Sequence, residues 1–438
     1  MLRPDLIQTA LPSDQLLAMP LKQNILANYL GTGVGAVAPL LALPFYLLAL
    51  GPKQFGLIAF IVMLQALLGL VDAGMSQALV REFALRANNS QAGRLRSSAL
   101  LFGFERIYWA FAMAAGLMTV LLADAISSHW LKLDGLPVEL GRHAVYGAAV
   151  IFACQFPGSV YRSVLVGAQA QVALNVLVSC SAVVRHGGGV VIVLIWPTLH
   201  AYLIWQALIA LLETLVRGYL AWKTVGLARD QAAWRASELY PVLGSVAGMS
   251  GAVWLGALTT QMDKMVLSRM VSIEQFGYYT IASTIGMGAL QLIYPLFQAV
   301  LPRAMQLKED HDALRALYIK LLGVIALVVA TGGLVFFSAG KWLLHAWLGS
   351  SALVGSILPV LSVLLVGTTL NAFYNIGYVN WIVQEKIRRV FQVNFLCFFL
   401  LLALLPTLVE SQGLIGAALG WLTVNLIGFI LSLGWLKK

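Results

Sequence analysis

The chain has 438 residues, of which 60% are hydrophobic and only 11% are charged. An average soluble domain carries roughly 25% charged residues, so this composition excludes an ordinary soluble protein and predicts one that spans a membrane. The net charge of +10 is spread over short segments between apolar runs and does not form one basic face. This distribution argues against a nucleic-acid-binding protein.

About twelve apolar runs follow one another along the chain, each close to the roughly 20 residues that a membrane-spanning helix needs. They lie near residues 24–50, 57–80, 99–123, 144–167, 174–196, 201–221, 242–264, 276–301, 321–346, 357–381, 394–409 and 414–436. The expected fold is therefore an all-α polytopic membrane protein with about twelve transmembrane helices.

Basic residues gather in alternate connecting segments, with eighteen in one set of segments and four in the other. The positive-inside rule places the richer set, together with both chain termini, in the cytoplasm. The first apolar run is longer than the h-region of a cleaved signal peptide, which has about 7 to 15 residues. We therefore expect a multi-pass protein without a cleaved signal peptide.

The sequence lacks the common motifs of enzymes: it contains no HExxH, no GxSxG and no Walker A motif. The longest segment outside the predicted helices has about twenty residues, which is too few for a soluble catalytic domain. The three cysteines fall inside predicted helices and the six histidines are scattered, so we expect no disulfide framework and no metal site. These features predict a protein that is not an enzyme and has no cofactor.

An internal repeat relates the two halves of the sequence. The segment GPKQFGLIAFIVMLQALLGLVDAGMSQALVREFA aligns with VSIEQFGYYTIASTIGMGALQLIYPLFQAVLPRAMQ at an offset of 221 or 222 residues. Gln54–Gly56 meets Gln275–Gly277, and a weaker match pairs Asn175 with Asn394. An even number of predicted helices separates the copies, so both halves have the same orientation. Parallel repeats of this kind usually hold a substrate site at their interface.

Two six-helix lobes around a central cavity are the expected architecture. The expected domains are a cytoplasmic N-terminal segment (1–23), an N-lobe with helices 1–6 (24–221), a charged cytoplasmic linker (222–240) and a C-lobe with helices 7–12 (241–438).

Three segments carry a resemblance to a known family. The run LGPKQFGLIAFIVMLQALLGLVDAGMSQALVREFA resembles the second-helix signature of polysaccharide flippases. QMDKMVLSRMVSIEQFGYYTIAS resembles the segment that joins their seventh and eighth helices, and GAQAQVALN resembles their short fourth-to-fifth loop. On these segments the chain is identified as a member of the Wzx-type O-antigen and polysaccharide flippases, in the multidrug/oligosaccharidyl-lipid/polysaccharide exporter superfamily.

The resemblance implies transport of an undecaprenyl-pyrophosphate-linked oligosaccharide repeat unit between the leaflets of the bacterial inner membrane. It also implies cooperation with a polysaccharide polymerase and a chain-length regulator. We expect alternating access, in which two lobes rock about a cationic cavity that holds the anionic cargo. Uphill transport would need coupling to H+ or Na+.

Arg185 lies in the apolar run SCSAVVRHGGGVVIVLIW, roughly 15 Å beyond the predicted cytoplasmic end of its helix. A lipid-facing arginine at that depth costs roughly 3 kcal/mol or more, so we expect the side chain to line a hydrated cavity and hold an anion. Gly187–Gly189 permit a bend or a close approach of backbone or cargo. The alternative is a structural arginine satisfied by an acid or by carbonyls of a neighbouring helix.

Other cations in the predicted helices are further candidates for the anion site. Arg162 follows Pro157 in the predicted inner-leaflet half, where it could contact cargo or extend to the lipid headgroups. Arg217 is four residues from Glu213, so these two residues can neutralise each other on one helix face. Arg106 is adjacent to Glu105, so the two side chains cannot face the same surface.

Acidic residues in the predicted helices are candidates for ion coupling or gating. Asp72, in LVDAGMS, lies inside the bilayer, where a carboxylate can carry a proton or sodium ion or can cap a broken helix. Asp263 and Lys264 could pair across the lobe interface in one state and separate in the other. Glu213 and Glu105 are the remaining candidates.

Asn371 and Asn375 are four residues apart in the tenth predicted helix and would form a polar stripe that lines the cavity.

Two other classes of function compete with a polysaccharide flippase. In a drug or cation antiporter of the same architecture, acidic residues are expected to outnumber basic ones in the cavity. Here six bases outnumber four acids in or near the predicted helices, which favours an anionic cargo. The bases are Arg106, Arg162, Arg185, Arg217, Lys264 and Arg269, and the acids are Asp72, Glu105, Glu213 and Asp263. A membrane-embedded glycosyltransferase, polymerase or ligase is disfavoured by the short outer loops and the lack of an acid/base constellation.

Overall fold

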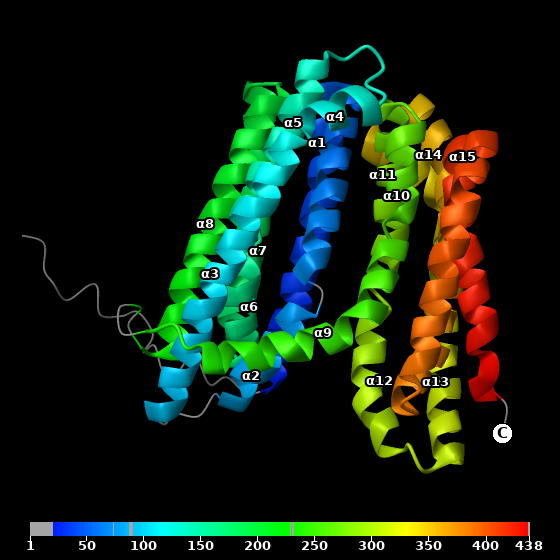
Figure 1. Ribbon diagram of the computed structural model, residues 1–438. Coiled ribbons are helices and arrows are strands. Elements are labelled where there is room, and N and C mark those ends of the chain that lie inside the picture. Colours follow the sequence, from blue (N-terminus) through cyan, green and yellow to red (C-terminus); the bar gives the residue numbers. More distant parts are fainter. Residues whose placement is uncertain (1–20, 73, 87–90, 228, 230–231, 437–438) are drawn as a thin grey trace, which may run out of the picture. The chain divides into compact units, whose positions relative to one another are not determined.

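The computed structural model describes residues 21–72, 74–86, 91–227, 229 and 232–436. Most of the predicted N-terminal segment 1–23 and part of the predicted linker 222–240 lie outside these residues. The described chain is almost entirely helical, and its only strand-like pairing is an isolated bridge between Lys132 and Ser272. The expected all-α fold is therefore confirmed (Figure 1).

The elements follow in this order: α1 (Leu21–Gly69), η2 (Leu70–Asp72), α2 (Met75–Arg86), α3 (Gln91–Leu121), α4 (Ala123–Ala125), η3 (Ile126–Trp130), α5 (Val138–Gln155), α6 (Gly158–Gly167), α7 (Gln171–Ile195), α8 (Leu199–Val225), α9 (Ala236–Thr259), α10 (Met262–Met270), α11 (Ile273–Leu290), α12 (Tyr294–Gln306), α13 (His311–Leu348), α14 (Ser351–Val383), α15 (Ile387–Ser432) and η5 (Leu433–Leu436).

Nine helical segments of the described chain are long and apolar enough to cross a membrane. Two of them contain a glycine with non-helical backbone angles, Gly51 in α1 and Gly413 in α15, so each of these covers two predicted runs. The seventh predicted run corresponds to α9. Each of the twelve apolar runs therefore corresponds to one or more helical segments of the described residues, and α1 and α15 each contain a kink between two runs.

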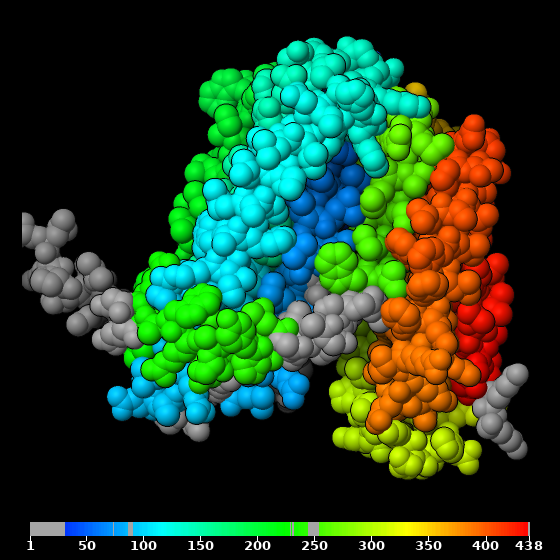
Figure 2. All heavy atoms as spheres, in the orientation of Figure 1, coloured from blue at the N-terminus to red at the C-terminus, as the bar shows by residue number. Residues whose placement is uncertain are grey.

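Gly413 is the point at which α15 folds back on itself. Its φ of 57° lies in the left-handed region that glycine tolerates best. Beyond it, a Cβ on Gly416 would lie 1.9 Å from the carbonyl oxygen of Leu408, and the Cys397 thiol lies 3.8 Å from the carbonyl oxygen of Val424. The orange and red arms of α15 run side by side in Figure 1 and touch in Figure 2.

Contacts divide the chain into two compact units that do not follow the halves of the sequence. Unit 1 comprises the described parts of 1–50, 68–124 and 142–250, and unit 2 comprises 51–67, 125–141 and 251–438. Two segments from the first half of the sequence, 51–67 and 125–141, therefore pack with the second half. The lobe boundaries expected from the repeat, 24–221 and 241–438, stay a prediction.

Unit 1 has an aromatic core that connects α3 to α5 and α6. Tyr108 and Phe156 stack with ring centroids 5.0 Å apart, and Phe152 packs on Phe156 at the same distance. Pro157 follows directly and separates α5 from the short helix α6. Because proline lacks an N–H group, the helix is interrupted there, and α6 begins a new direction that positions Arg162.

Unit 2 contains a direct contact between the two copies of the repeated Gln-Phe-Gly motif. A Cβ on Gly277 would lie 3.1 Å from the Cα atom of Gly56. A Cβ on Gly56 would lie only 1.9 Å from the carbonyl oxygen of Ile273. Glycine in both copies is therefore what allows the two backbones to approach so closely. We refer to this contact as the glycine seam.

The segment 125–141 reinforces the glycine seam from one side. The Trp130 indole N–H donates to the Ser268 hydroxyl at 2.9 Å, and the Lys132 ammonium donates to the carbonyl oxygen of Met270 at 2.6 Å. The Ile273 backbone N–H donates to the carbonyl oxygen of Lys132 at 2.9 Å. Unit 2 thus joins segments that are about 140 residues apart in the sequence through backbone and side-chain hydrogen bonds.

The weaker sequence match also has a structural counterpart. Asn175 in α7 packs against Gly31 in α1, where a Cβ would lie 2.4 Å from the Asn175 Oδ1 atom. Asn394 in α15 packs against Gly256 in α9, where a Cβ would lie 3.1 Å from the Asn394 Nδ2 atom. An asparagine-on-glycine contact therefore occurs in each half of the chain.

Candidate functional site

The most highly charged buried group in unit 1 is formed by α7 and α8, which pack side by side (Figure 1). Glu213 bridges two arginines: its Oε2 atom lies 2.6 Å from the Arg185 guanidinium, and its Oε1 atom accepts from the Arg217 guanidinium. The side chains of Arg185 and Arg217 are 14% exposed and that of Glu213 is 11% exposed. The expected pair between Glu213 and Arg217 is present, and Arg185 shares the same carboxylate.

The alternative that the sequence offered for Arg185, an acid of a neighbouring helix, is observed, although the sequence analysis did not identify Glu213 as that acid. Pro197 and Thr198 form a short turn between α7 and α8, and the Thr198 hydroxyl caps α8 by accepting from the Ala201 N–H. Arg185 precedes this turn by about 18 Å and Glu213 follows it by about 24 Å, at 1.5 Å per residue. The two residues therefore sit at similar depths of an antiparallel helix pair, within reach of long side chains.

Gly188 and Gly189 permit close packing, and the run Gly187–Gly189 does not break the helix. α7 continues unbroken through Gly187–Gly189 to Ile195. A Cβ on Gly188 would lie 2.2 Å from the ring of Trp205, and a Cβ on Gly189 would lie 2.5 Å from the Tyr46 hydroxyl. Of the two alternatives from the sequence, the close approach is observed and the bend is not.

Trp205 and Tyr46 fix the α7 backbone beside the arginine. The Trp205 indole N–H donates to the Arg185 carbonyl oxygen at 3.0 Å, and the Tyr46 hydroxyl donates to the His186 carbonyl oxygen at 3.2 Å. Tyr46 also makes an edge contact with Tyr202, with ring centroids 5.2 Å apart. These contacts hold the Arg185 Cα position, so the guanidinium is the part of the residue that is free to move.

Arg162 brings a third positive charge to the same group. It lies one turn along α6 from Gly158, where a Cβ would be 3.2 Å from the Arg217 guanidinium, and the charges of Arg162 and Arg185 both act on Arg217. Arg162 is exposed and makes no ion pair among the described residues. Two guanidinium groups thus share the single carboxylate of Glu213 and a third acts on Arg217 through its charge, so the four residues carry a net charge of +2. We call these four residues the arginine cluster.

The arginine cluster also has more donors than acceptors. The Nε atom of Arg217 is buried and has no hydrogen-bond partner among the described residues. A guanidinium group has five N–H donors, and a buried donor without an acceptor costs about 1–3 kcal/mol. The arrangement is therefore suited to bind an additional anion.

Asp72 is held by hydroxyl groups at the break between α1 and α2. Its carboxylate accepts from Tyr108 at 2.5 Å and from the Ser76 hydroxyl at 2.6 Å, and also from Ser159 and the Ser76 backbone N–H. The helix-capping role that the sequence offered as one alternative stays a prediction. Asp72 forms no ion pair among the described residues, so its donors are neutral. A carboxylate of this kind can also take a proton or bind a small cation.

Glu105 and Arg106 point in different directions, as their adjacency predicts. Glu105 is buried, accepts from the Tyr161 hydroxyl at 2.6 Å and pairs with Arg229 at 3.1 Å. Arg106 is exposed, folds over the Phe102 ring and donates to the Phe102 carbonyl oxygen at 3.1 Å. The structure gives Arg106 no contact with the arginine cluster.

In unit 2, both carboxylate oxygens of Asp263 accept hydrogen bonds from groups of the same unit. The Tyr279 hydroxyl donates to one carboxylate oxygen at 2.5 Å, and the Lys264 backbone N–H donates to the other at 2.7 Å. The carboxylate is 6% exposed. The Lys264 side chain forms no ion pair with it in the described structure. A gating role for these two residues stays a prediction.

Asn371 and Asn375 belong to an amide network between α14 and α15. Asn371 donates to the Asn425 side-chain oxygen at 2.6 Å, and Asn375 donates to the Asn371 side chain at 2.8 Å. Asn425 is 3% exposed and donates to the Trp421 carbonyl oxygen at 2.7 Å. The sequence interpretation missed Asn425, an isolated amide in the last apolar run. The network links two helices, and its cavity-lining role stays a prediction.

Replacing Asn425 by leucine is expected to lower the free energy of unfolding by about 1–3 kcal/mol, because the half-buried Asn371 amide loses its acceptor. The double variant Asn371→Leu/Asn425→Leu should recover part of the loss, since both partners are then apolar. Thermal unfolding of the purified variants measures both changes. A polar lining without a structural role predicts no loss in Asn425→Leu.

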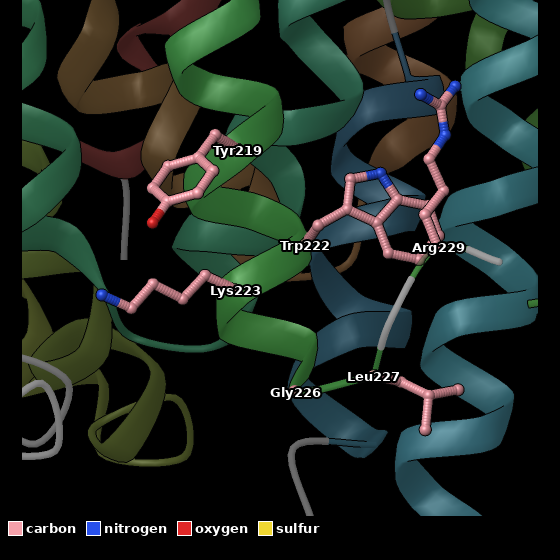
Figure 3. Close-up of a pocket in the computed structure, with 6 residues that line it drawn as sticks. All are labelled: Tyr219, Trp222, Lys223, Gly226, Leu227 and Arg229. Carbon is pink, nitrogen blue, oxygen red and sulfur yellow. The ribbon is translucent and has the colours of Figure 1, made fainter. Parts of the chain in front are cut away.

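A pocket of about 290 Å³ lies at the end of α8 and is lined by Tyr219, Trp222, Lys223, Gly226, Leu227 and Arg229. Figure 3 shows the Lys223 ammonium and the Arg229 guanidinium pointing to opposite sides of the helix. Arg229 is turned toward Glu105, with which it pairs. The two cationic groups of the pocket therefore do not point toward a common centre. The arginine cluster is the better candidate for an anion site.

Comparisons with known proteins bear on the family and on the fold of the chain. A model of the polysaccharide biosynthesis protein family matches residues 21–308. A putative O-antigen transporter of Shigella flexneri is 22% identical over 423 residues, which cover 95% of this chain and 98% of the relative.

Two solved structures have the same fold. The lipid II flippase MurJ in an inward closed conformation aligns with a TM-score of 0.73 at 13% identity, over 95% of this chain and 87% of that chain. An inward-facing multidrug resistance transporter of the MATE family aligns with a TM-score of 0.69 at 13% identity, over 92% of this chain and 97% of that chain. The latter is described as a member of the MOP superfamily.

Proposed function

Because the chain belongs to the polysaccharide biosynthesis protein family, we propose that it is a flippase for an undecaprenyl-pyrophosphate-linked oligosaccharide repeat unit. The cargo crosses the bacterial inner membrane by alternating access, and the arginine cluster holds its anionic headgroup. Both chain termini are cytoplasmic in this proposal, in keeping with the distribution of basic residues. A polysaccharide polymerase and a chain-length regulator are the proposed partners.

The observation that carries the proposal is the excess of positive charge in the arginine cluster. Arg185 and Arg217 share the Glu213 carboxylate, and Arg162 adds a third positive charge that has no ion-pair partner among the described residues. Arginine offers a planar pair of N–H donors that matches phosphate oxygens, and it stays charged at any relevant pH. A pyrophosphate carries about two to three negative charges, so it would neutralise the cluster and supply its missing acceptors.

Ion coupling is assigned to Asp72 in this proposal. The carboxylate is surrounded by the hydroxyls of Tyr108, Ser76 and Ser159. Hydroxyl oxygens can accept as well as donate, so the same shell can stabilise a protonated carboxyl group or contribute oxygen ligands to Na+. The position is separate from the arginine cluster in sequence and in partners, which allows coupling ion and cargo to bind at different places.

The alternative is a small-molecule or drug antiporter with the same fold. A cationic drug would be repelled by the net charge of +2 on the arginine cluster. The balance of charge therefore favours the anionic cargo, and the assay below includes a cationic drug as a competing substrate.

The test is translocation in proteoliposomes of a fluorescent undecaprenyl-pyrophosphate oligosaccharide, with wild type compared to Arg162→Gln. Arg162 is chosen because no described partner loses a contact in the variant. Lys320→Gln, which removes an exposed cation of α13, is the matched control. We expect Arg162→Gln to slow transport by about tenfold, since each charge-assisted contact contributes about 1.5–3 kcal/mol, and Lys320→Gln to retain the wild-type rate.

Two outcomes would contradict the proposal. If the wild-type protein moves no lipid-linked oligosaccharide but exports a cationic drug, the antiporter is the correct function. If Arg162→Gln transports the lipid as fast as Lys320→Gln, the charge excess does not serve the cargo.

A further inference from the structure

Glu213 forms ion pairs with both of the buried arginines that the cargo would bind. Each oxygen of its carboxylate takes one guanidinium group, with Arg185 on Oε2 at 2.6 Å and Arg217 on Oε1. Two oxygens on one centre that bridge two arginines are also what a phosphate group presents. We propose that Glu213 is a resident carboxylate that holds the place of the cargo and is displaced by its pyrophosphate, an inference that rests on the proposed function.

The need for such a group follows from the burial of the arginines. Both arginine side chains are only 14% exposed and lie in helices long enough to cross the membrane. A transporter returns without cargo in each cycle, and bare guanidinium groups at that depth would cost roughly 3 kcal/mol each or more. Glu213 removes this cost in the cargo-free protein because its carboxylate is present in every state.

The contacts of the arginine cluster indicate that the Glu213 carboxylate can be exchanged for another anion and is not a permanent ion-pair partner. A permanent structural pair would have balanced charge, as Glu105 and Arg229 have. Here the net charge stays at +2 after Glu213 is counted, and the Arg217 Nε atom has no partner among the described residues. A second anion is therefore attracted while Glu213 is still in place.

Arg162 supplies the first contact for an incoming anion. Arg162 is exposed on α6 and has no ion pair among the described residues to break before it binds an anion. Its charge already acts on Arg217. Once the pyrophosphate bridges Arg162 and Arg217, the Glu213 carboxylate can turn away, because it is held by side-chain contacts only. Trp205 keeps the Arg185 backbone in place throughout. At release the Glu213 carboxylate returns to the two arginines and displaces the headgroup.

An internal competitor of this kind has a signature that distinguishes it from a structural counter-ion. Removing the Glu213 charge should strengthen cargo binding, because the headgroup no longer competes with a carboxylate, and should slow turnover, because release loses its driving group. A structural counter-ion predicts the opposite for binding, since Arg185 and Arg217 would repel each other and lose their arrangement. The direction of the change in affinity decides between the two roles.

The experiment measures binding of farnesyl pyrophosphate to the full-length protein in detergent, together with lipid translocation in proteoliposomes. Wild type is compared with Glu213→Gln and with Glu410→Gln, a control that makes the same change in net charge at an exposed residue of α15. We expect Kd to fall by about tenfold in Glu213→Gln and to change less than about twofold in the control. The maximal rate of translocation should fall in Glu213→Gln, while farnesol should not bind.

If Glu213→Gln does not fold, the same binding measurement is made on Glu213→Asp. The shorter side chain retains the charge but cannot span both arginines, so farnesyl pyrophosphate should bind it a few times more tightly than wild type. Folded variants that bind with wild-type or weaker affinity would show that Glu213 is a structural counter-ion and would overturn the inference alone. Failure of the wild type both to bind farnesyl pyrophosphate and to move the lipid-linked oligosaccharide would overturn the proposed function as well.

Discussion

Replacing Arg185 by glutamine is expected to slow translocation of the lipid-linked oligosaccharide by about 10- to 100-fold while the protein stays folded. The variant removes one of the two guanidinium groups that face the Glu213 carboxylate. A charge-assisted, bidentate contact contributes about 1.5–3 kcal/mol, which corresponds to this range of rates. Folding is retained because Glu213 keeps its contact with Arg217.

The measurement compares initial rates in proteoliposomes at equal amounts of folded protein, which size-exclusion chromatography determines. Arg185→Lys is the matched variant, since lysine keeps the charge but loses the planar pair of donors, and an intermediate rate is expected for it. Normal transport by folded Arg185→Gln would mean that Arg185 is structural and only neutralises Glu213.

Replacing Gly56 by alanine is expected to lower the free energy of unfolding strongly for the addition of a single methyl group. A Cβ at this position would lie 1.9 Å from the carbonyl oxygen of Ile273, and a backbone atom cannot move aside without shifting α11. Overpacking of a buried contact typically costs about 1–3 kcal/mol, and a clash with backbone places Gly56→Ala at the upper end of that range.

Gly69→Ala is the control for this prediction, because it lies in the same helix and a Cβ there meets nothing within 4 Å. Alanine is favoured over glycine inside a helix by about 0.5–1 kcal/mol, so Gly69→Ala should be as stable as wild type or slightly more so. Thermal unfolding in detergent measures both variants. Equal melting temperatures for Gly56→Ala and Gly69→Ala would show that the glycine seam tolerates separation.

The sequence predicts the fold well because the apolar runs respond to one dominant physical constraint. Backbone groups in hydrocarbon must be paired within the helix, so each run of about 20 apolar residues becomes a helix irrespective of its neighbours. The position of the turns depends on single glycines such as Gly51 and Gly413. Their effect is visible only in the backbone angles.

The candidate site is predicted in its residues but not in its partners. The depth of Arg185 follows from counting residues along a helix, whereas its contact with Glu213 depends on which faces of α7 and α8 meet. Helix phase from one sequence is too imprecise for that step. The same reason explains Asn371, whose partner Asn425 lies 54 residues away in another helix. Nothing in the local sequence links the two amides.

The glycine seam also bears on the history of the molecule. Gly56 and Gly277 are equivalent positions of the repeat and touch each other, as identical residues do at the axis of a two-fold symmetric dimer. The contact is the one expected if an ancestral homodimer became a single chain by gene duplication and fusion. At the offset of 219, the counterparts of Arg162 and Arg185 are Trp381 and Leu404. A symmetric ancestor would have carried two arginine clusters or none, so an arginine cluster in one half alone requires a fused chain.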